Sequence, residues 1–241
     1  MGEQVTPYRS EETKKAQVEQ MFDAIAPSYD RLNKMLTMRI DRLWRRNVIS
    51  MLKKQQPKHI LDVATGTCDL PIAMHKSLSY QTLQALDLSE QMLAKGQEKL
   101  NQKNITDIDL IKGDSEHLPF EDNSKDAITC AFGVRNFENL HAGLQEMARV
   151  VNETGQVIIL ELSTPKNKMF LKLYYFYFFN VLPFIGRLFS GDERAYAYLP
   201  ESVRAFPSGD EFADKLKAAG FKTVVCKPQT FGICTIYQAR K

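Results

Sequence analysis

Short apolar runs alternate with segments of helical pattern between residues 59 and 162, and this alternation limits the possible folds more than any other feature of the chain. The expected strands are His59–Val63, Thr82–Leu88, Ile108–Lys112, Ala127–Ala131 and Gln156–Leu162. Parallel strands need crossover connections, which the intervening helical segments supply, so the pattern predicts a parallel sheet covered by helices. Two last runs, Thr223–Lys227 and Cys234–Ala239, lie close together in the sequence and indicate a closing hairpin.

The composition is that of a globular protein, with 44% hydrophobic and 25% charged residues over 241 positions. A net charge of +3 is too small to indicate a nucleic-acid partner. The cysteines form no CxxC pair and have no histidine cluster near them, which argues against a zinc site. The polar N-terminus lacks the apolar core of a signal peptide, so we expect a cytoplasmic protein with free thiols.

Two helices are expected before the first strand, and they define residues 1–56 as an N-terminal helical lid. The first covers Glu11–Ile25 and is expected to break at Ala26-Pro27-Ser28, because proline disrupts a helix interior. The second covers Met38–Lys54. Its apolar stripe is surrounded by Arg39, Arg42, Arg45 and Arg46. This arginine-rich face is expected to favour anionic headgroups, with a plain solvated helix face as the alternative.

Aromatic residues crowd LYYFYFFNVLPFIG, Leu173 to Gly186, within the stretch from about 165 to 208 that precedes the last helix. Lys172 and Arg187 flank a run too short to cross a membrane, because a spanning helix needs roughly 20 apolar residues. The stretch therefore indicates an aromatic helical cap that lines an apolar pocket or touches a membrane surface. A dimer interface and ordinary core packing remain the alternatives.

The loop after the first strand, in ILDVATGTCDL from Ile60 to Leu70, has the features of a ligand-binding turn. Small residues let a ligand approach the backbone, and the following helix offers free N–H groups. The dinucleotide pattern GxGxxG is absent, since Gly66 is the only glycine of the loop. A diphosphate ligand and a nicotinamide oxidoreductase are therefore disfavoured.

Aspartates stand at the ends of the first three expected strands, at Asp62, Asp87 and Asp114. Asp87 can accept hydrogen bonds from both ribose hydroxyls, and Asp114, beside Ser115, can accept from an adenine amine. Taken singly, each is more often a helix cap or a turn residue. All three in register favour a nucleoside ligand at the carboxyl edge of the sheet.

This pattern resembles that of the class I S-adenosylmethionine-dependent methyltransferases. The resemblance implies a Rossmann-like α/β fold with a mostly parallel seven-stranded sheet, helices on both faces and an antiparallel terminal strand. It also implies S-adenosyl-L-methionine as the cofactor of a domain spanning 57–241, with no metal. The residues implied to bind this cofactor are Asp62, Thr65, Gly66, Thr67, Asp87, Leu88, Asp114, Ser115 and Ala131.

Four segments resemble one family within that class, the quinone C-methyltransferases that act on demethylmenaquinol or on a polyprenyl-methoxybenzoquinol. They are YDRLNKMLTMRIDRLW from Tyr29, TCAFGVRNFENL from Thr129, ARVVNETGQVIILELSTP from Ala148, and FNVLPFIGRLFSGDERAYAYLPESVRAFP from Phe179. The chain departs from the family pattern at Asp41, usually histidine, at Thr37, usually serine, and at Cys68, usually glycine. Asp41 argues against a mechanism that needs a histidine base at that position.

The implied reaction adds a methyl group to a ring carbon of a quinol that has lost a phenolic proton. Nearby positive charge lowers the pKa of a phenol, so Arg135, after the fourth strand, is the expected catalytic residue. Asn136 is expected to hold the second quinol oxygen. An ion pair of Arg135 with Glu138 or Glu161 is the alternative.

The residues expected to contact the substrate are Tyr29, Phe132, Tyr174, Tyr177 and Phe178. Tyr29 and Asp30 are placed where the lid would close, with a plain helix end as the alternative. His141 is a weaker candidate base, and Cys130 is expected to be buried in its strand rather than to act as a nucleophile.

The function implied by the resemblance is C-methylation of demethylmenaquinol to menaquinol. The alternative is C-methylation of 2-polyprenyl-6-methoxy-1,4-benzoquinol. A third interpretation is a methyltransferase-like scaffold that binds lipid or protein without turnover. A lipophilic polyprenyl quinol is the expected partner, and no nucleic acid is expected. We also expect transient contact with the inner face of the cell membrane, and the sequence leaves a homodimer open.

Overall fold

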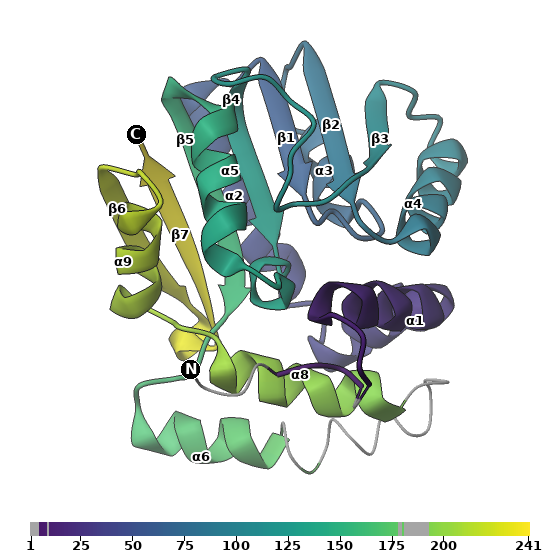
Figure 1. Ribbon diagram of the computed structural model, residues 1–241, viewed down its shortest axis with the longest axis vertical. Helices are drawn as coiled ribbons and strands as arrows, with labels where there is room; N and C mark the ends of the chain where they lie inside the picture. The colour runs from purple at the N-terminus through teal and green to yellow at the C-terminus, as the bar shows by residue number, and fades with distance from the viewer. Residues whose placement is uncertain (1–4, 9, 178–179, 181–192) are drawn as a thin grey trace.

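The computed structural model describes residues 5–8, 10–177, 180 and 193–241 of the chain (Figure 1). Its strands are β1 (His59–Val63), β2 (Thr82–Asp87), β3 (Ile108–Lys112), β4 (Lys125–Ala131), β5 (Val151–Leu162), β6 (Thr223–Gln229) and β7 (Cys234–Arg240). Its helices are α1 (Lys14–Leu36), α2 (Asp41–Gln55), α3 (Asp69–His75), α4 (Glu90–Gln102), α5 (Leu140–Val150), α6 (Lys168–Phe176), α8 (Glu193–Ala205) and α9 (Asp210–Ala218). Two 3₁₀ turns, η1 (Val134–Asn136) and η3 (Thr230–Gly232), complete the described elements.

The strands form one seven-stranded sheet in the order β3-β2-β1-β4-β5-β7-β6. Strands β1 to β5 pair in parallel, whereas β7 pairs antiparallel with both β5 and β6. This arrangement confirms the predicted fold, including the closing hairpin. The strand order reverses direction between β1 and β4, so the loops that follow these two strands open a crevice at the carboxyl edge.

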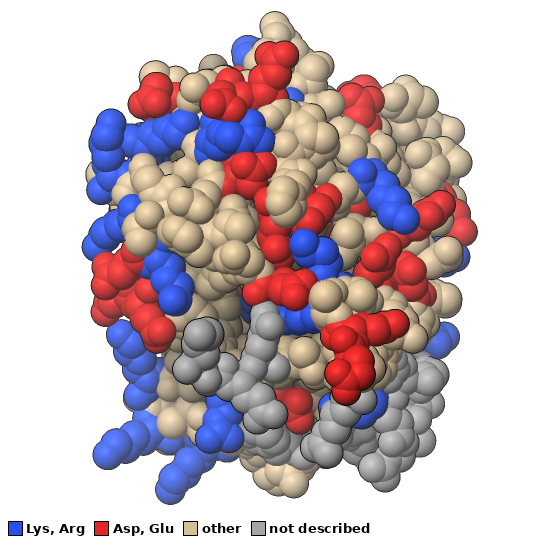
Figure 2. Space-filling view, viewed as in Figure 1, with Lys and Arg blue, Asp and Glu red and all other residues tan. Residues whose placement is uncertain are grey.

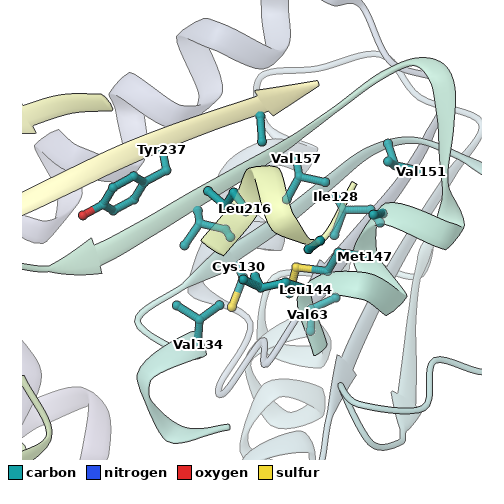
Figure 3. Close-up of a cluster of buried hydrophobic side chains, with 14 of the residues drawn as sticks. Val63, Ile128, Cys130, Val134, Leu144, Met147, Val151, Val157, Leu216 and Tyr237 are labelled. Atoms are coloured by element: carbon teal, nitrogen blue, oxygen red, sulfur yellow. The ribbon is translucent and has the colours of Figure 1, made fainter. Parts of the chain in front are cut away.

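Successive residues of each central strand point to opposite faces of the sheet, and both faces are buried. Leu61 belongs to the core under α5 and α9, which Figure 3 shows around Ile128, Met147 and Leu216. Its neighbour Ile60 belongs to the core under α2, α3 and α4. Helices on both faces hold the strands in place, and they hold the strand-end loops with them.

Helix α1 is unbroken, so the break predicted at Pro27 is wrong. The proline has no backbone N–H, and nearby the Ser28 hydroxyl donates to the Ile25 carbonyl at 3.2 Å. Met21 before the proline and Leu32 after it are buried in the same hydrophobic cluster. Packing of both halves against one surface offsets the loss of a single helical hydrogen bond.

Helices α1, α6 and α8 lie beyond the carboxyl edge of the sheet, at the bottom of Figure 1. Val18, Tyr174 and Tyr198, one from each helix, are buried in a shared cluster. The predicted aromatic cap falls partly here, while Phe178 lies outside the described residues. Among the helices that the structure describes, none is long and apolar enough to cross a membrane.

Candidate active site

A cavity of about 100 Å³ lies at the carboxyl edge, beside the point where the strand order reverses. All the residues predicted to bind the cofactor line it: Asp62, Thr65, Gly66, Thr67, Asp87, Leu88, Asp114, Ser115 and Ala131. We call this space the cofactor cavity. Residues from four different strand-end loops meet there because parallel strands all end at the same edge of the sheet.

Asp62, at the end of β1, is buried and shapes the loop that follows it. Its carboxylate accepts from the Thr65 hydroxyl at 2.7 Å and from the Thr129 hydroxyl of β4. Burial raises the pKa of Asp62 to about 6, although both hydroxyls act to lower it. A positive group in the cavity would therefore favour the ionised form of this carboxylate.

Asp87, at the end of β2, holds the same loop by hydrogen bonds. Its carboxylate accepts from the Gly66 backbone N–H at 2.7 Å and from the Ser89 N–H at 2.9 Å. Burial raises the pKa of Asp87 to about 6 against these two donors. The loop itself turns through left-handed residues, with φ of 57° at Gly66 and 62° at Cys68. Cys68 thus keeps the backbone shape that a glycine there would favour, at some cost in strain.

Asp114, after β3, is tied to helix α1 across the mouth of the cavity. Lys15 places its Nζ atom 2.7 Å from one Asp114 oxygen and 3.3 Å from a Glu116 oxygen. The pKa of Asp114 is lowered, because the hydrogen bond from Lys15 and the Glu116 N–H outweigh burial. Val18, Glu19 and other α1 residues line the cavity as well, so α1 covers it.

A partly buried charge cluster, which was not predicted from the sequence, joins α1 to the cofactor loop. Lys99 of α4 donates to Asp30 of α1 at 2.8 Å, to the Thr67 hydroxyl at 3.0 Å, and to Asp69. The Thr67 hydroxyl also donates to Asp30 at 2.5 Å. Asp30 therefore lies inside a helix and fastens it, rather than marking a helix end. Neither helical spacing nor a position at a strand end in the sequence reveals these contacts, because each partner comes from a different part of the fold.

A second cavity of about 390 Å³ adjoins the first, and we call it the aromatic cavity. Its lining is mostly apolar and comes from α1, α2, α6, α8 and the η3 turn, together with η1 and the ends of β4 and β5. Tyr29, Phe132, Tyr174 and Tyr177 line it, as the substrate prediction requires. Phe22, Tyr29, Arg45 and Phe132 line both cavities and so form their junction.

Arg135 lies in η1 and reaches the aromatic cavity from the sheet side. Its Nη1 atom is 3.0 Å from an oxygen of Glu161, a fully buried residue of β5. Burial alone would lower the pKa of Arg135, but Glu161 outweighs it and raises that pKa, so the guanidinium stays charged. The predicted alternative of an ion pair with Glu161 is thus present, and Arg135 of this pair lines the cavity. Lys14 of α1 donates to the Arg135 carbonyl at 3.2 Å and helps to hold η1.

Asn136 lines the cofactor cavity, next to Arg135 in sequence but on the other side of η1. Its buried Oδ1 atom has no hydrogen-bond partner among the described residues. Such an atom is a candidate acceptor for a ligand. The predicted catalytic pair is therefore divided between the two cavities.

The arginine-rich face of α2 needs one correction. Arg42 and Arg46 of α2 and Arg39, which precedes the helix, are exposed, but the Arg45 side chain is only 15% exposed. It pairs with buried Asp41, and its guanidinium lies 5.8 Å from the centre of the Phe132 ring. Asp41 replaces the family's histidine with a carboxylate that holds a cation at the junction of the cavities.

The remaining candidates fall outside both cavities. His141 is exposed at the start of α5, and Cys130 is buried inside β4. Burial raises the pKa of the Cys130 thiol well above its ordinary value, which removes it as a nucleophile. Across the described ranges, no group of three or more His, Cys, Asp or Glu side chains is placed to hold a metal ion.

Comparison with known proteins now decides the family. Residues 10–241 match the model of the ubiE/COQ5 methyltransferase family. The chain belongs to this family. It is 44% identical over 240 residues to a demethylmenaquinone methyltransferase of Bacteroides fragilis, covering 99% of this chain and 98% of that one.

Other comparisons agree with this membership. A ubiquinone/menaquinone biosynthesis C-methyltransferase of Geobacter sulfurreducens is 41% identical over 98% of this chain and 93% of its own length. Among solved structures, a putative S-adenosyl-L-methionine-dependent methyltransferase from Methanococcus maripaludis superimposes with a TM-score of 0.64. It covers 97% of both chains at 19% identity, which supports the fold alone. The protein is a methyltransferase, as the sequence predicted.

Proposed function

We propose that the protein methylates a ring carbon of demethylmenaquinol, with S-adenosylmethionine as the methyl donor. The observation that carries this proposal is the junction of the two cavities. The cofactor cavity, whose carboxylates can accept hydrogen bonds from a nucleoside, adjoins the larger, apolar aromatic cavity, which Arg135 lines. A methyl donor and a lipophilic phenol need this pairing, because their reacting atoms must meet where water is excluded.

The lining of the cofactor cavity fits S-adenosylmethionine. Asp62, Asp87 and Asp114 offer carboxylate oxygens to its amine and hydroxyl groups, and Asn136 offers a buried, unpartnered oxygen. When bound, S-adenosylmethionine supplies an electrophilic methyl group. The junction residues Tyr29 and Phe132 line both cavities, so they lie where that group would meet the quinol.

Arg135 supports the chemistry from the aromatic cavity. A cation in a low-dielectric site stabilises a phenolate, and a phenolate directs electron density to the ring carbon that is methylated. Glu161 fixes the guanidinium in place, and it leaves the Nε atom buried and without a partner among the described residues. Arg135 therefore lowers the pKa of the bound quinol and holds its oxygen.

The mouth of the aromatic cavity fits a substrate that resides in a membrane. Met38, at the rim, is 74% exposed, and Phe231 of the η3 turn is 68% exposed while it stacks on Phe170 of α6. Lys168 and Lys172 of α6 are exposed nearby in sequence, and Figure 2 shows basic side chains at the lower left, around the position of α6. Exposed apolar side chains beside lysines suit an anionic membrane surface.

Helix α1 acts as the lid in this proposal. The cofactor cavity of about 100 Å³ is smaller than the roughly 300 Å³ at the low end of small-molecule sites. Lys15 and Asp30 fasten α1 over it through charged contacts rather than through apolar packing alone. Loading of the cofactor therefore requires α1 to move outward and return.

The test is methyl transfer from labelled S-adenosylmethionine to chemically reduced demethylmenaquinol, run beside 2-polyprenyl-6-methoxy-1,4-benzoquinol. We expect label on the naphthoquinol ring, located by mass spectrometry, and none with the oxidised quinone. Label in the benzoquinol as well would assign both quinones to one enzyme. Bound cofactor with no label in either quinol would refute the proposed function.

A further inference from the structure

Buried polar atoms without a hydrogen-bond partner are costly, and each one needs an explanation. In the part of the chain that the structure describes, several such atoms line the two cavities: Arg45 Nε, Arg135 Nε, Asn136 Oδ1 and Tyr198 Oη. The proposed function already uses Arg135 and Asn136. Tyr198 was not selected from the sequence, and its hydroxyl has no hydrogen-bond partner among the residues that the structure describes.

Tyr198 comes from α8 and is 2% exposed. Its ring is packed in the cluster shared by α1, α6 and α8, so the side chain has little freedom to turn away. Helix α8 packs on η1, the turn that carries Arg135, and both residues line the aromatic cavity.

We propose that the Tyr198 hydroxyl donates a hydrogen bond to the same quinol oxygen that Arg135 stabilises, so that the two residues form a clamp on the phenolate. Tyr198 is then a catalytic residue that contacts substrate. This proposal rests on the proposed function and adds a second donor to it. The quinol loses its phenolic proton to water, and Tyr198 keeps its own.

The electrostatics of the site support a donor rather than a base. Burial raises the pKa of Tyr198 to about 12, although Arg135 acts to lower it. At neutral pH the hydroxyl is therefore protonated and can donate to an oxyanion. A preorganised donor in a dry site favours the charged form of its partner, which is the role of an oxyanion hole.

The experiment compares Tyr198→Phe with Tyr237→Phe, a matched control. Each variant removes one buried phenolic hydroxyl, but the Tyr237 hydroxyl accepts from the Gly209 N–H at 2.8 Å and lies outside both cavities. Y198F should lower kcat about 10- to 100-fold, with unchanged affinity for S-adenosylmethionine and no fall in Tm. Y237F should do the reverse, lowering Tm while kcat stays at the wild-type value.

A second readout does not depend on turnover. The chromogenic phenol 4-nitro-1-naphthol reports its own ionisation by absorbance, and Trp44, the chain's single tryptophan, lines the aromatic cavity and reports binding by fluorescence. Wild type and Y237F should lower the pKa of the bound probe. Y198F should raise that bound pKa by about one to two units relative to wild type.

The outcomes separate this inference from the proposed function. Equal kcat and equal probe pKa in wild type and Y198F would overturn the clamp, even where quinol methylation by wild type is demonstrated. A probe pKa that depends on Tyr198, in an enzyme that methylates neither quinol, would support the clamp and remove the proposed substrate. A probe that does not bind, or binds with an unshifted pKa in wild type, would also overturn the clamp.

Discussion

The cofactor cavity and the aromatic cavity share a junction but are built by different means. The cofactor cavity is made from loops at the ends of parallel strands, and its carboxylates are held by backbone N–H groups and hydroxyls, as Asp87 is held by Gly66. The aromatic cavity is made mainly from helices far apart in the sequence, and its lining consists mainly of apolar side chains. We propose that the first binds its ligand by hydrogen bonds from a rigid frame, and that the second binds by shape and by its two cations, Arg135 and, at the junction, Arg45.

This difference implies a division of labour that mutations can test. Changes in the cofactor cavity should alter affinity for S-adenosylmethionine, whereas changes around Arg135 should alter the reaction of the bound quinol. Residues at the junction, such as Tyr29, should affect both. A variant in one cavity that alters the property assigned to the other would show that the cavities act as one site.

The largest effect is expected from neutralising the buried ion pair with the double variant Arg135→Gln/Glu161→Gln. Replacing both partners avoids an unpaired buried charge, which by itself costs about 3–5 kcal/mol of stability. We expect kcat to fall about 1,000-fold, because the phenolate loses its cation, while the affinity for S-adenosylmethionine changes little. Stopped-flow turnover and calorimetry on the same preparation measure the two quantities.

Asp87→Ala is the matched control in the other cavity. It should weaken cofactor binding while the quenching of Trp44 fluorescence by demethylmenaquinone stays at the wild-type level. If the double variant also lost cofactor affinity, the two cavities would be energetically coupled and the division of labour would be wrong.

A smaller effect is expected when the pH is lowered, and it should appear as a weaker affinity for S-adenosylmethionine. Burial raises the pKa of both Asp62 and Asp87 to about 6 in the free protein. A cationic ligand with hydroxyl donors favours their ionised forms, so binding must release protons near pH 6. From pH 7 to pH 5 the Kd for S-adenosylmethionine should rise about tenfold for each of these carboxyls that is coupled to the ligand. Calorimetry in buffers of different ionisation enthalpy measures both the Kd and the proton release.

The free energy of unfolding of the free protein should change in the opposite direction to cofactor affinity: it should rise as the pH falls. A carboxyl whose folded pKa lies above its unfolded value stabilises the fold fully below the unfolded pKa, near 4. That contribution is lost as pH rises through 6. Asp62→Asn should therefore flatten this part of the stability profile between pH 4 and 6, measured by urea unfolding. A profile identical to that of wild type would mean that Asp62 titrates normally.

The contrast between the cavities also explains what the sequence could predict. The strand alternation identified the sheet, and strand-end residues such as Asp62 and Asp87 were found because a parallel sheet brings consecutive strand ends together. Arg45 was grouped with the arginines expected to face anionic headgroups, because helix periodicity does not show that its guanidinium turns back to Asp41. Lys99 has partners from distant elements, and Tyr198 reaches the aromatic cavity together with Arg135 only through the tertiary fold, so no local pattern encodes either arrangement. Pro27 was misread because tertiary packing overrode its local propensity.

The smallest effect is expected at the lid, which belongs to both cavities. Lys15 is 28% exposed and pairs with Asp114 across the cofactor cavity. Ion pairs of this exposure contribute up to about 1 kcal/mol, so Lys15→Met should raise the dissociation rate of S-adenosylmethionine only about threefold. Stopped-flow displacement measures this rate, and kcat should not change.

Lys112→Met is the control for the lid, because Lys112 also pairs with α1, at 3.7 Å from Glu19, but is 54% exposed and does not reach Asp114. Loss of that pair should leave the dissociation rate at the wild-type value, since solvent screens it. A faster rate in K15M alone would show that the ion pair of Lys15 with Asp114 holds the lid closed over the cofactor cavity. Equal rates in all three proteins would mean that the partly buried cluster of Lys99 and Asp30 holds α1, and that the lid opens from the aromatic side instead.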